Sequence, residues 1–310
     1  MSQNNPLTAI LNVQPFILLD GAMATELEAR GCDLADSLWS AKVLVENPEL
    51  IREVHLDYFR AGAQVAITAS YQATPAGFAA RGFNEAQSKA LIGKSVELAR
   101  KAREAYLAEN PQAGTLLVAG SIGPYGAYLA DGAEYRGDYV CTPETFRAFH
   151  RPRVEALLDA GVDLLACETL PNFIEIKALA ELLTEYPRAR AWFSFTLRDS
   201  EHLSDGTPLR DVISVLENDA QVVAVGINCI ALEQTLPALQ HLHSLTALPL
   251  VVYPNSGERY DAVSKTWHHH DEACTTLAEY LPQWLAAGAK LIGGCCRTTP
   301  KDIAELNAQR

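Results

Sequence analysis

The stretch Ala61-Gly62-Ala63-Gln64-Val65 has two counterparts, Ala160-Gly161-Val162-Asp163-Leu164 and Ala287-Gly288-Ala289-Lys290-Leu291. In each copy the glycine follows a segment of helical periodicity and precedes a short apolar run. A glycine just past a helix can adopt the left-handed conformation, which lets the chain turn directly into the next strand. The three copies therefore predict a repeating unit of helix and strand.

Short apolar runs, many of them β-branched, alternate with longer helix-period segments along the whole chain. The runs are Phe16–Asp20, Val65–Ala69, Leu116–Ser121, Leu164–Glu168, Ala191–Leu197, Val223–Cys229, Leu250–Tyr253 and Leu291–Cys295. Each is almost continuously apolar, which is typical of a parallel sheet covered on both faces. Eight strands, each followed by a helix, predict one (β/α)8 TIM barrel over residues 1–310. A doubly wound sheet is the alternative, but no Gly-x-Gly-x-x-Gly follows the first strand.

Composition narrows the classes of function. The 310 residues are 48% hydrophobic and 20% charged, as in ordinary globular proteins. The net charge of 25 − 38 = −13 argues against a nucleic-acid partner and fits either a solvated acidic surface or a cationic ligand. Seven cysteines indicate a reducing compartment rather than a disulfide scaffold. We find neither a signal-peptide pattern nor an apolar run of about 20 residues, and expect a cytoplasmic protein without a membrane partner.

Polar residues gather at the predicted strand ends, where the active sites of such barrels form. These ends are Asp20-Gly21-Ala22, Thr68-Ala69-Ser70-Tyr71-Gln72, Gly120–Tyr125, Cys167-Glu168-Thr169, Asn228-Cys229, Pro254–Gly257 and Gly293–Cys296. Glu168 is a carboxylate at the end of an apolar strand. It could act as a base, hold an ammonium group, or form an ion pair with a nearby cation.

Three cysteines lie at two of these ends. Cys229 closes strand six, and Cys295-Cys296 closes strand eight, so three thiols could meet above the barrel. Three thiolates and one open position would suit a catalytic zinc ion. Neighbouring strand residues face opposite ways, so the pair can chelate one ion only where the strand ends or kinks, a freedom that Gly293-Gly294 supplies. The alternatives are three buried inert cysteines, or a phosphate site at the two glycines.

The other cysteines and a histidine run are interpreted as structural. Cys32 and Cys141 are expected in loops, Cys274 on a helix and Cys167 inside strand four. The run His268-His269-His270 is expected on a solvated loop rather than at a metal.

Taken together, three motifs resemble the zinc-dependent homocysteine S-methyltransferases. They are Asp20-Gly21-Ala22-Met23-Ala24-Thr25-Glu26-Leu27, Gly226-Ile227-Asn228-Cys229 and Gly293-Gly294-Cys295-Cys296-Arg297, and the likeness covers nearly the whole chain. Two further motifs resemble the bacterial branch whose donors are S-methylmethionine or S-adenosylmethionine: Gly120–Ala127 and Glu134–Tyr139. Relatives that use betaine or cobalamin share the cysteines.

The resemblance implies a role for each matching residue. It implies that Zn²⁺ is bound by Cys229, Cys295 and Cys296, that Glu168 holds the homocysteine amino group as a catalytic-site residue, and that Asp20 and Gly21 line the amino-acid pocket. Weaker substrate-side candidates are Thr68, Ser70, Tyr71 and Asn228. Ala24 stands where the family often has Gly, and Thr169 where the betaine branch has an aromatic residue. The resting fourth zinc ligand is therefore open.

The implied chemistry suits these residue types. A metal-bound thiol is deprotonated, and three cysteinates on Zn²⁺ give a net charge of −1 that keeps a fourth thiolate nucleophilic. A sulfonium donor is a cation, which aromatic faces of Trp39, Tyr71 or Tyr125 could hold. The alternatives are betaine as donor, a zinc hydrolase, or a thiol redox or zinc-binding protein using Cys295 and Cys296. No oligomeric state is predicted.

Overall fold

The computed structural model describes residues 4–36, 38–261, 263, 266–269 and 276–310. Eight parallel strands form its central sheet, one at each predicted run. They are β1 (Ile17–Leu18), β2 (Val65–Ile67), β3 (Leu117–Ile122), β4 (Leu164–Leu170), β5 (Ala191–Phe195), β8 (Val222–Asn228), β9 (Leu250–Tyr253) and β12 (Ala289–Ile292). The predicted strand positions are confirmed, with ends that differ by up to three residues.

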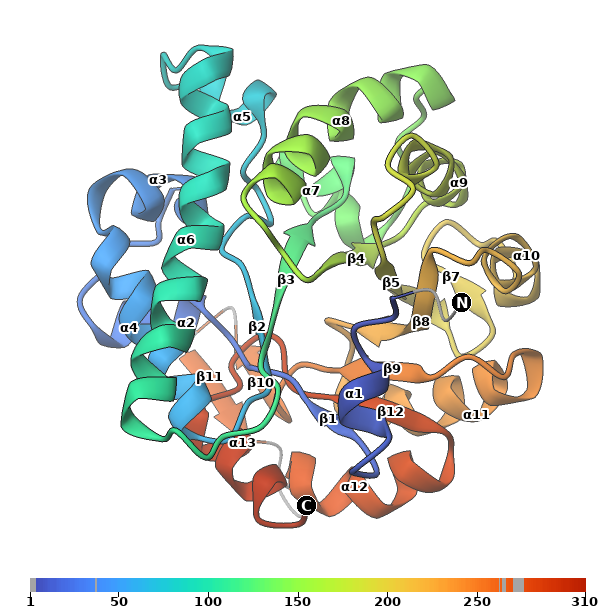
Figure 1. Cartoon of the computed structure of the whole chain (residues 1–310). Coiled ribbons are helices and arrows are strands. Elements are labelled where there is room, and N and C mark those ends of the chain that lie inside the picture. Colours follow the sequence, from blue (N-terminus) through green and yellow to red (C-terminus); the bar gives the residue numbers. More distant parts are fainter. Residues whose placement is uncertain (1–3, 37, 262, 264–265, 270–275) are drawn as a thin grey trace.

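The sheet closes on itself. Its order is β1-β12-β9-β8-β5-β4-β3-β2, and every neighbouring pair is parallel. The two edges meet through a parallel bridge between Leu19 and Val65 and through the Gln64 N–H, which donates to the Leu18 carbonyl at 2.7 Å. The chain is therefore a (β/α)8 barrel, as predicted, with its strands enclosed by helices (Figure 1).

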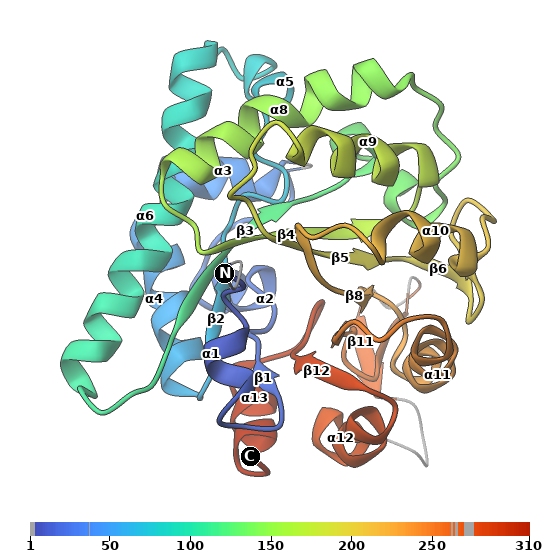
Figure 2. The ribbon, with the colours of Figure 1, turned by 45° about the vertical axis from the view of Figure 1, so that its right-hand side comes forward.

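Helices surround the strands on the outside of the barrel, as Figures 1 and 2 show. Their bounds are α2 (Ala24–Ala29), α3 (Trp39–Glu46), α4 (Pro48–Arg60), α5 (Pro75–Ala79), α6 (Glu85–Glu109), α7 (Tyr125–Leu129), α8 (Pro143–Asp159), α9 (Phe173–Leu183), α10 (Leu209–Leu216), α11 (Thr235–Leu245), α12 (Leu277–Ala286) and α13 (Pro300–Asn307), with 3-10 turns η1 (Ala133–Tyr135) and η2 (Leu232–Gln234). Helices α4, α8 and α13 each begin at a proline, where the missing N–H costs no hydrogen bond.

The repeated junctions adopt the predicted geometry. Gly62, Gly161 and Gly288 have φ angles of 110°, 90° and 94°. At Gly62 and Gly288 a Cβ atom would also lie within 2.5 Å of a neighbouring side chain. Glycine at these positions thus lets the chain turn directly from α4 into β2, from α8 into β4 and from α12 into β12.

Two apolar layers hold the barrel together. One lies between strands and helices, and the second fills the barrel interior, where Leu19, Val65, Trp192 and Leu291 belong to one buried cluster. A short helix, α1 (Thr8–Leu11), adds Ile10 to this interior cluster. α1 precedes β1 and lies beside β1 and β12 (Figures 1 and 2).

Two hairpins outside the barrel were not predicted. They are β6 (Leu197–Asp199) with β7 (His202–Leu203), and β10 (Glu258–Asp261) with β11 (Thr266–His269). His268 and His269 therefore belong to a strand, and the loop expected for them is wrong. His270 and Cys274 lie outside the described residues. Within the described part of the chain, no helix is long and apolar enough to cross a membrane.

Candidate metal and active site

Three cysteine sulfurs meet at the carboxyl ends of the strands. Cys229 follows β8, Cys295 and Cys296 follow β12, and only β9 lies between these two strands. The three Sγ atoms all lie within 4.8 Å of one another. Since β12 ends at Ile292, the cysteine pair lies beyond the strand, where two neighbouring side chains can face the same point.

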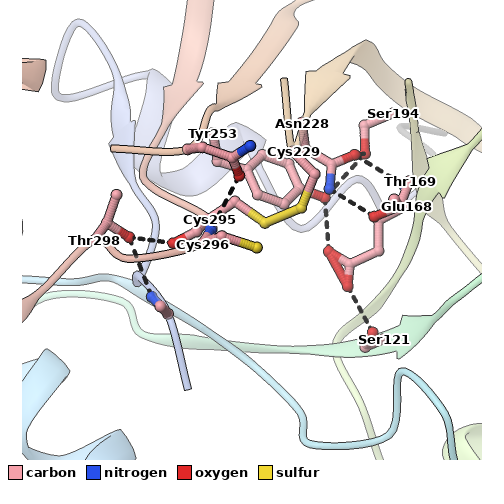
Figure 3. The surroundings of a disulfide bond; sticks show 12 residues. Ser121, Glu168, Thr169, Ser194, Asn228, Cys229, Tyr253, Cys295, Cys296 and Thr298 are labelled. Carbon is pink, nitrogen blue, oxygen red and sulfur yellow. Dashed lines mark hydrogen bonds between the residues drawn. A yellow bond between two sulfur atoms is a disulfide. The ribbon is translucent and has the colours of Figure 1, made fainter. Parts of the chain in front are cut away.

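Two of these sulfurs are bonded to each other in this structure. A disulfide joins Cys229 and Cys295, with 5.5 Å between the Cα atoms, and the Cys296 thiol lies free beside it (Figure 3). The bonded pair is thus not the adjacent Cys295-Cys296 pair that a redox interpretation suggested. The oxidised state removes two of the three candidate ligands.

Backbone contacts fix the cysteine turn. The N–H of Cys295 donates to the Pro254 carbonyl at 2.7 Å, and the N–H of Cys296 donates to Oδ1 of Asn255 at 3.2 Å. Thr298 Oγ1 donates to the Cys295 carbonyl at 2.6 Å. The segment after β9 and the loop before α13 therefore position the cysteines from two sides.

The two glycines before the cysteines have ordinary φ angles and allow close packing. Neither Gly293 nor Gly294 has a positive φ. A Cβ on Gly293 would lie 2.7 Å from the Asp20 carbonyl oxygen, and a Cβ on Gly294 would lie 2.4 Å from Thr298 Oγ1. The strand does end directly before these glycines, as predicted, and their lack of side chains also allows close approach of the β1 end and the loop before α13.

Left-handed backbone is concentrated at this end of the barrel. Thr169, Cys229 and Arg297 have φ angles of 59°, 53° and 66°. Non-glycine residues rarely adopt this conformation, and where they do it often marks a functional site. Here it occurs at two strand ends and directly after the cysteine pair.

The thiols line a hollow of about 440 Å³, within the usual range for small-molecule sites. Of the predicted site residues, its lining includes Asp20, Gly21, Thr68, Tyr71, Glu168, Asn228, Cys229, Cys295 and Cys296. Trp39 lines it too, whereas Tyr125 packs among aromatic rings such as Tyr139 and Phe149. The placement of Tyr125 does not support the cation contact expected for it.

Ser70 lies below the hollow rather than in its lining. Its side chain is fully buried, and its hydroxyl donates to the Ser121 carbonyl at 2.8 Å and lies 2.6 Å from Thr68 Oγ1. Thr68 Oγ1 in turn accepts from the Ser121 N–H at 3.0 Å. Ser70 thus joins the ends of β2 and β3, and its placement does not support the substrate contact expected for it.

Glu168 is buried at the end of β4 with a partner for each oxygen. Ser121 Oγ donates to its Oε2 at 2.6 Å, and the Tyr253 hydroxyl donates to its Oε1 at 2.9 Å (Figure 3). Burial raises the pKa of Glu168 to about 7, although both hydrogen bonds favour the ionised form. The charge of the buried Arg153 lowers this pKa only as the smallest of these effects, and no ion pair to Glu168 is formed among the described residues.

Asp20 faces the same region. Its Oδ2 accepts from the Ile67 N–H at 2.9 Å, and burial, with a smaller contribution from the Glu168 charge, raises its pKa well above the usual range. Two buried carboxyl groups, each raising the cost of ionising the other, thus line the same hollow.

Asn228 ties the glutamate strand to a cysteine strand. Its Oδ1 accepts from the Thr169 N–H at 2.8 Å and from Ser194 Oγ at 2.7 Å, and its Nδ2 donates to Thr169 Oγ1 at 2.8 Å. Because Cys229 follows directly, Asn228 fixes the cysteine relative to β4.

Two residues of the site, Tyr253 and Arg153, belong to none of the motifs quoted above, and Glu134 and Tyr135 belong to one but were given no individual role. Tyr253, which orients Glu168, is the last residue of a predicted strand, so the strand-end rule contains the signal that would have found it. Glu134 and Tyr135 line the hollow from η1. Arg153 of α8 is fully buried and donates to the carbonyls of Tyr71 and Gly123, both at 2.7 Å. No sequence pattern around Arg153 indicates that its side chain hydrogen-bonds the segments after two different strands.

The fold and the site together define a (β/α)8-barrel enzyme with a cluster of three cysteines at the carboxyl ends of its strands. The sequence model of the homocysteine S-methyltransferase family matches residues 17–309. The chain therefore belongs to that family and is a methyltransferase.

Individual relatives agree with this family. The homocysteine S-methyltransferase of Escherichia coli K12 is 84% identical over all of both chains, and the Bacillus subtilis homocysteine S-methyltransferase YbgG is 52% identical over 98% of this chain and 97% of its own. Crystal structures of the E. coli homocysteine methyltransferase MmuM, one described as metallated and one as oxidized, each match with a TM-score of 0.92 and 79% identity, covering 99% of this chain and all of theirs.

Proposed function

We propose that this chain transfers a methyl group from a sulfonium donor, S-methylmethionine or S-adenosylmethionine, to the thiolate of homocysteine and so forms methionine, with a zinc ion held by Cys229, Cys295 and Cys296. The observation that carries the proposal is the meeting of three thiols with two buried carboxylates in one hollow. The names of the relatives support homocysteine as the acceptor.

The thiols fit a zinc ion by their chemistry and spacing. Soft sulfur ligands suit zinc, and a site with three protein ligands keeps a fourth position for a substrate. When bound, the ion would hold the homocysteine sulfur as a thiolate at neutral pH. The description of one E. coli homocysteine methyltransferase structure as metallated supports a bound metal in this chain as well.

Glu168 and Asp20 would bind the amino group of homocysteine. Both carboxylates are buried, and burial makes their charges costly without a cation. An ammonium group would restore the ionised forms and fix the amino-acid end of the substrate. Ser121 and Tyr253 hold the Glu168 carboxylate in the required orientation.

The remaining chemistry needs alignment rather than a protein base. Attack on a methyl carbon requires the two sulfurs and the carbon in line, with reacting atoms about 3–3.5 Å apart. No proton leaves the methyl group, so the protein's tasks are to orient both substrates and exclude water. The aromatic faces of Trp39 and Tyr71 in the lining suit a cationic donor.

A side-by-side assay tests the proposal. Zinc-loaded, reduced protein is incubated with homocysteine and with S-methylmethionine, S-adenosylmethionine or betaine, and methionine is measured. We expect the highest rate with S-methylmethionine, a lower rate with S-adenosylmethionine and none with betaine. If methionine forms with betaine but with neither sulfonium compound, betaine is the donor and the proposed donor is wrong. If methionine forms with none of the three, sulfonium-dependent transfer is refuted.

A further inference from the structure

We propose that Glu134 recognises the positive sulfur of the methyl donor, and that it is therefore a residue that determines the donor class. This inference rests on the proposed function, because it requires that the donor be a cation. The residue lies on η1, between α7 and α8, and its side chain lines the hollow that holds the three thiols.

The backbone around Glu134 is fixed from several sides. Thr196 Oγ1 donates to the Glu134 carbonyl at 2.8 Å, and Asp131 Oδ1 accepts from the Ala133 N–H at 3.0 Å. Gly126 packs so closely that a Cβ there would lie 2.7 Å from the Glu134 nitrogen. The carboxylate is thus carried on a rigid turn, as a recognition group should be.

Glu134 differs from the other carboxylates that line the hollow. Asp20 accepts a backbone hydrogen bond, both oxygens of Glu168 have donors, and Glu28 is exposed. Among the described residues, Glu134 Oε2 is buried and has no hydrogen-bond partner. The Arg136 charge lowers the pKa of Glu134 only as the smallest of the effects that act on it, after burial, a backbone hydrogen bond and the charge of Asp131. A buried carboxylate oxygen without a hydrogen-bond donor is a site for a positive charge from a ligand.

The surroundings favour a sulfonium over an ammonium at this point. Tyr71, Tyr135 and Cys296 line the same hollow. Burial, and then the charges of Cys296 and Glu134, raise the pKa of Tyr135, so this ring lies near both groups. The methyl to be transferred must lie beside the thiol cluster, and a sulfonium needs negative charge and aromatic faces but no hydrogen-bond acceptor. The carboxylate of Glu134 supplies the negative charge, and the rings of Tyr135 and Tyr71 supply the aromatic faces.

The test varies the charge at this position. Glu134→Gln, Glu134→Asp and Glu134→Lys are made in the full chain, loaded with zinc under reducing conditions, and assayed with each substrate varied in turn. We expect the Gln variant to raise the KM for S-methylmethionine about tenfold or more. The Lys variant should raise it further and the Asp variant less, while the KM for homocysteine and the zinc content stay within about twofold of the unmodified chain.

Asp138→Asn is the matched control. It removes one negative charge from the same connection between α7 and α8, at an exposed residue outside the lining of the hollow. We expect its donor KM to change by less than about twofold. Thermal melting of each variant separates a loss of recognition from a loss of folding.

Two failures are distinguishable. If the unmodified chain forms no methionine from a sulfonium donor, the proposed function is wrong and this inference is overturned with it. If the unmodified chain is active and folded Glu134→Gln keeps its donor KM, or if both substrate KM values rise equally, Glu134 does not recognise the donor and only the further inference is overturned.

Discussion

Each candidate zinc ligand is held by backbone contacts that do not depend on the metal. The N–H of Cys229 donates to the Tyr253 carbonyl at 3.2 Å, and Cys295 and Cys296 are bonded to the β9 end. Removal of one sulfur should therefore leave the fold intact while it removes a ligand.

We expect Cys229→Ala and Cys296→Ala each to lose zinc and activity together and to remain folded. A site with two thiolates binds zinc far more weakly than one with three. Zinc per chain, methionine formation and the circular dichroism spectrum are compared with those of Cys32→Ala, whose thiol lies outside the hollow. Full zinc retention in either ligand variant would exclude that cysteine from the site.

Glu168→Gln should impair homocysteine binding much more than zinc binding. Loss of a charged hydrogen bond costs about 1.5–3 kcal/mol, or roughly 10–100-fold in kcat/KM for homocysteine. Its pKa of about 7 adds a pH dependence, because the residue becomes protonated as the pH falls through that value. In the unmodified chain kcat/KM should decline below pH 7, and this decline should be absent from the variant. An unchanged kcat/KM at pH 8 would remove Glu168 from the pocket.

The disulfide predicts a competition with the metal. While Cys229 and Cys295 are bonded to each other, neither sulfur is available as a thiolate ligand. We expect protein oxidised with a small disulfide to take up almost no zinc, and a thiol reductant to restore about one zinc per chain. Oxidised protein that has lost two free thiols and still binds zinc fully would contradict the shared use of these sulfurs.

At the scale of elements, the barrel strands are predictable because their signal is local. Leu250–Tyr253 is identified with its bounds, and the junction glycines mark where helices end. The strand ends are less accurate: β1 is only two residues long, and β12 ends three residues before Cys295. Strand ends depend on pairing with neighbours, which the sequence pattern of one segment does not contain.

The two extra hairpins and α1 have a different cause. His202 and Leu203 form a strand only because they pair with the segment around Leu197, and α1 is only four residues long. So short a helix is stabilised by burial of its apolar side in the barrel interior rather than by its own propensity. Such elements follow from tertiary contacts.

A buried histidine of α4 predicts how stability depends on pH. His55 is fully buried, neither ring nitrogen has a hydrogen-bond partner among the described residues, and burial lowers its pKa from 6.5 to about 4. The unfolded chain therefore binds this proton first, so stability is complete above pH 6.5 and declines as the pH falls toward 4. The loss at pH 5 is about 2 kcal/mol.

Urea unfolding at pH 8 and pH 5 checks this. The unmodified chain should lose about 2 kcal/mol more than His55→Leu between these two pH values, because leucine cannot titrate. An equal loss in both proteins would show that His55 does not contribute.

At the scale of the molecule, closure of the barrel creates the site. Cys229 and Cys295 are 66 residues apart in the chain and come together only because β8, β9 and β12 are adjacent. Strand order in a (β/α)8 barrel follows chain order, so the meeting of the cysteines was predictable once the strands were identified. The supporting contacts of Tyr253, Glu134 and Arg153 were not, because they depend on side-chain directions that only the packed structure fixes.

Part of the negative charge of the molecule is concentrated in the hollow. The net charge of −13 is compatible with many functions, but four carboxylates and one arginine are among the residues that line the hollow. Burial raises the pKa of three of these carboxyl groups, and a cationic ligand would favour their ionised forms. Some of the acidic residues that give the chain its net negative charge therefore lie in the hollow where a sulfonium donor would bind.

The most direct test of the account is a zinc titration of reduced, metal-free protein in the presence of homocysteine and S-methylmethionine. We predict that methionine formation is absent without metal, rises in proportion to added zinc, stops rising near about one zinc per chain, and fails to appear in Cys296→Ala. Full methionine formation by the metal-free protein, or a rate independent of zinc, would contradict the claim that the three-thiol site activates homocysteine.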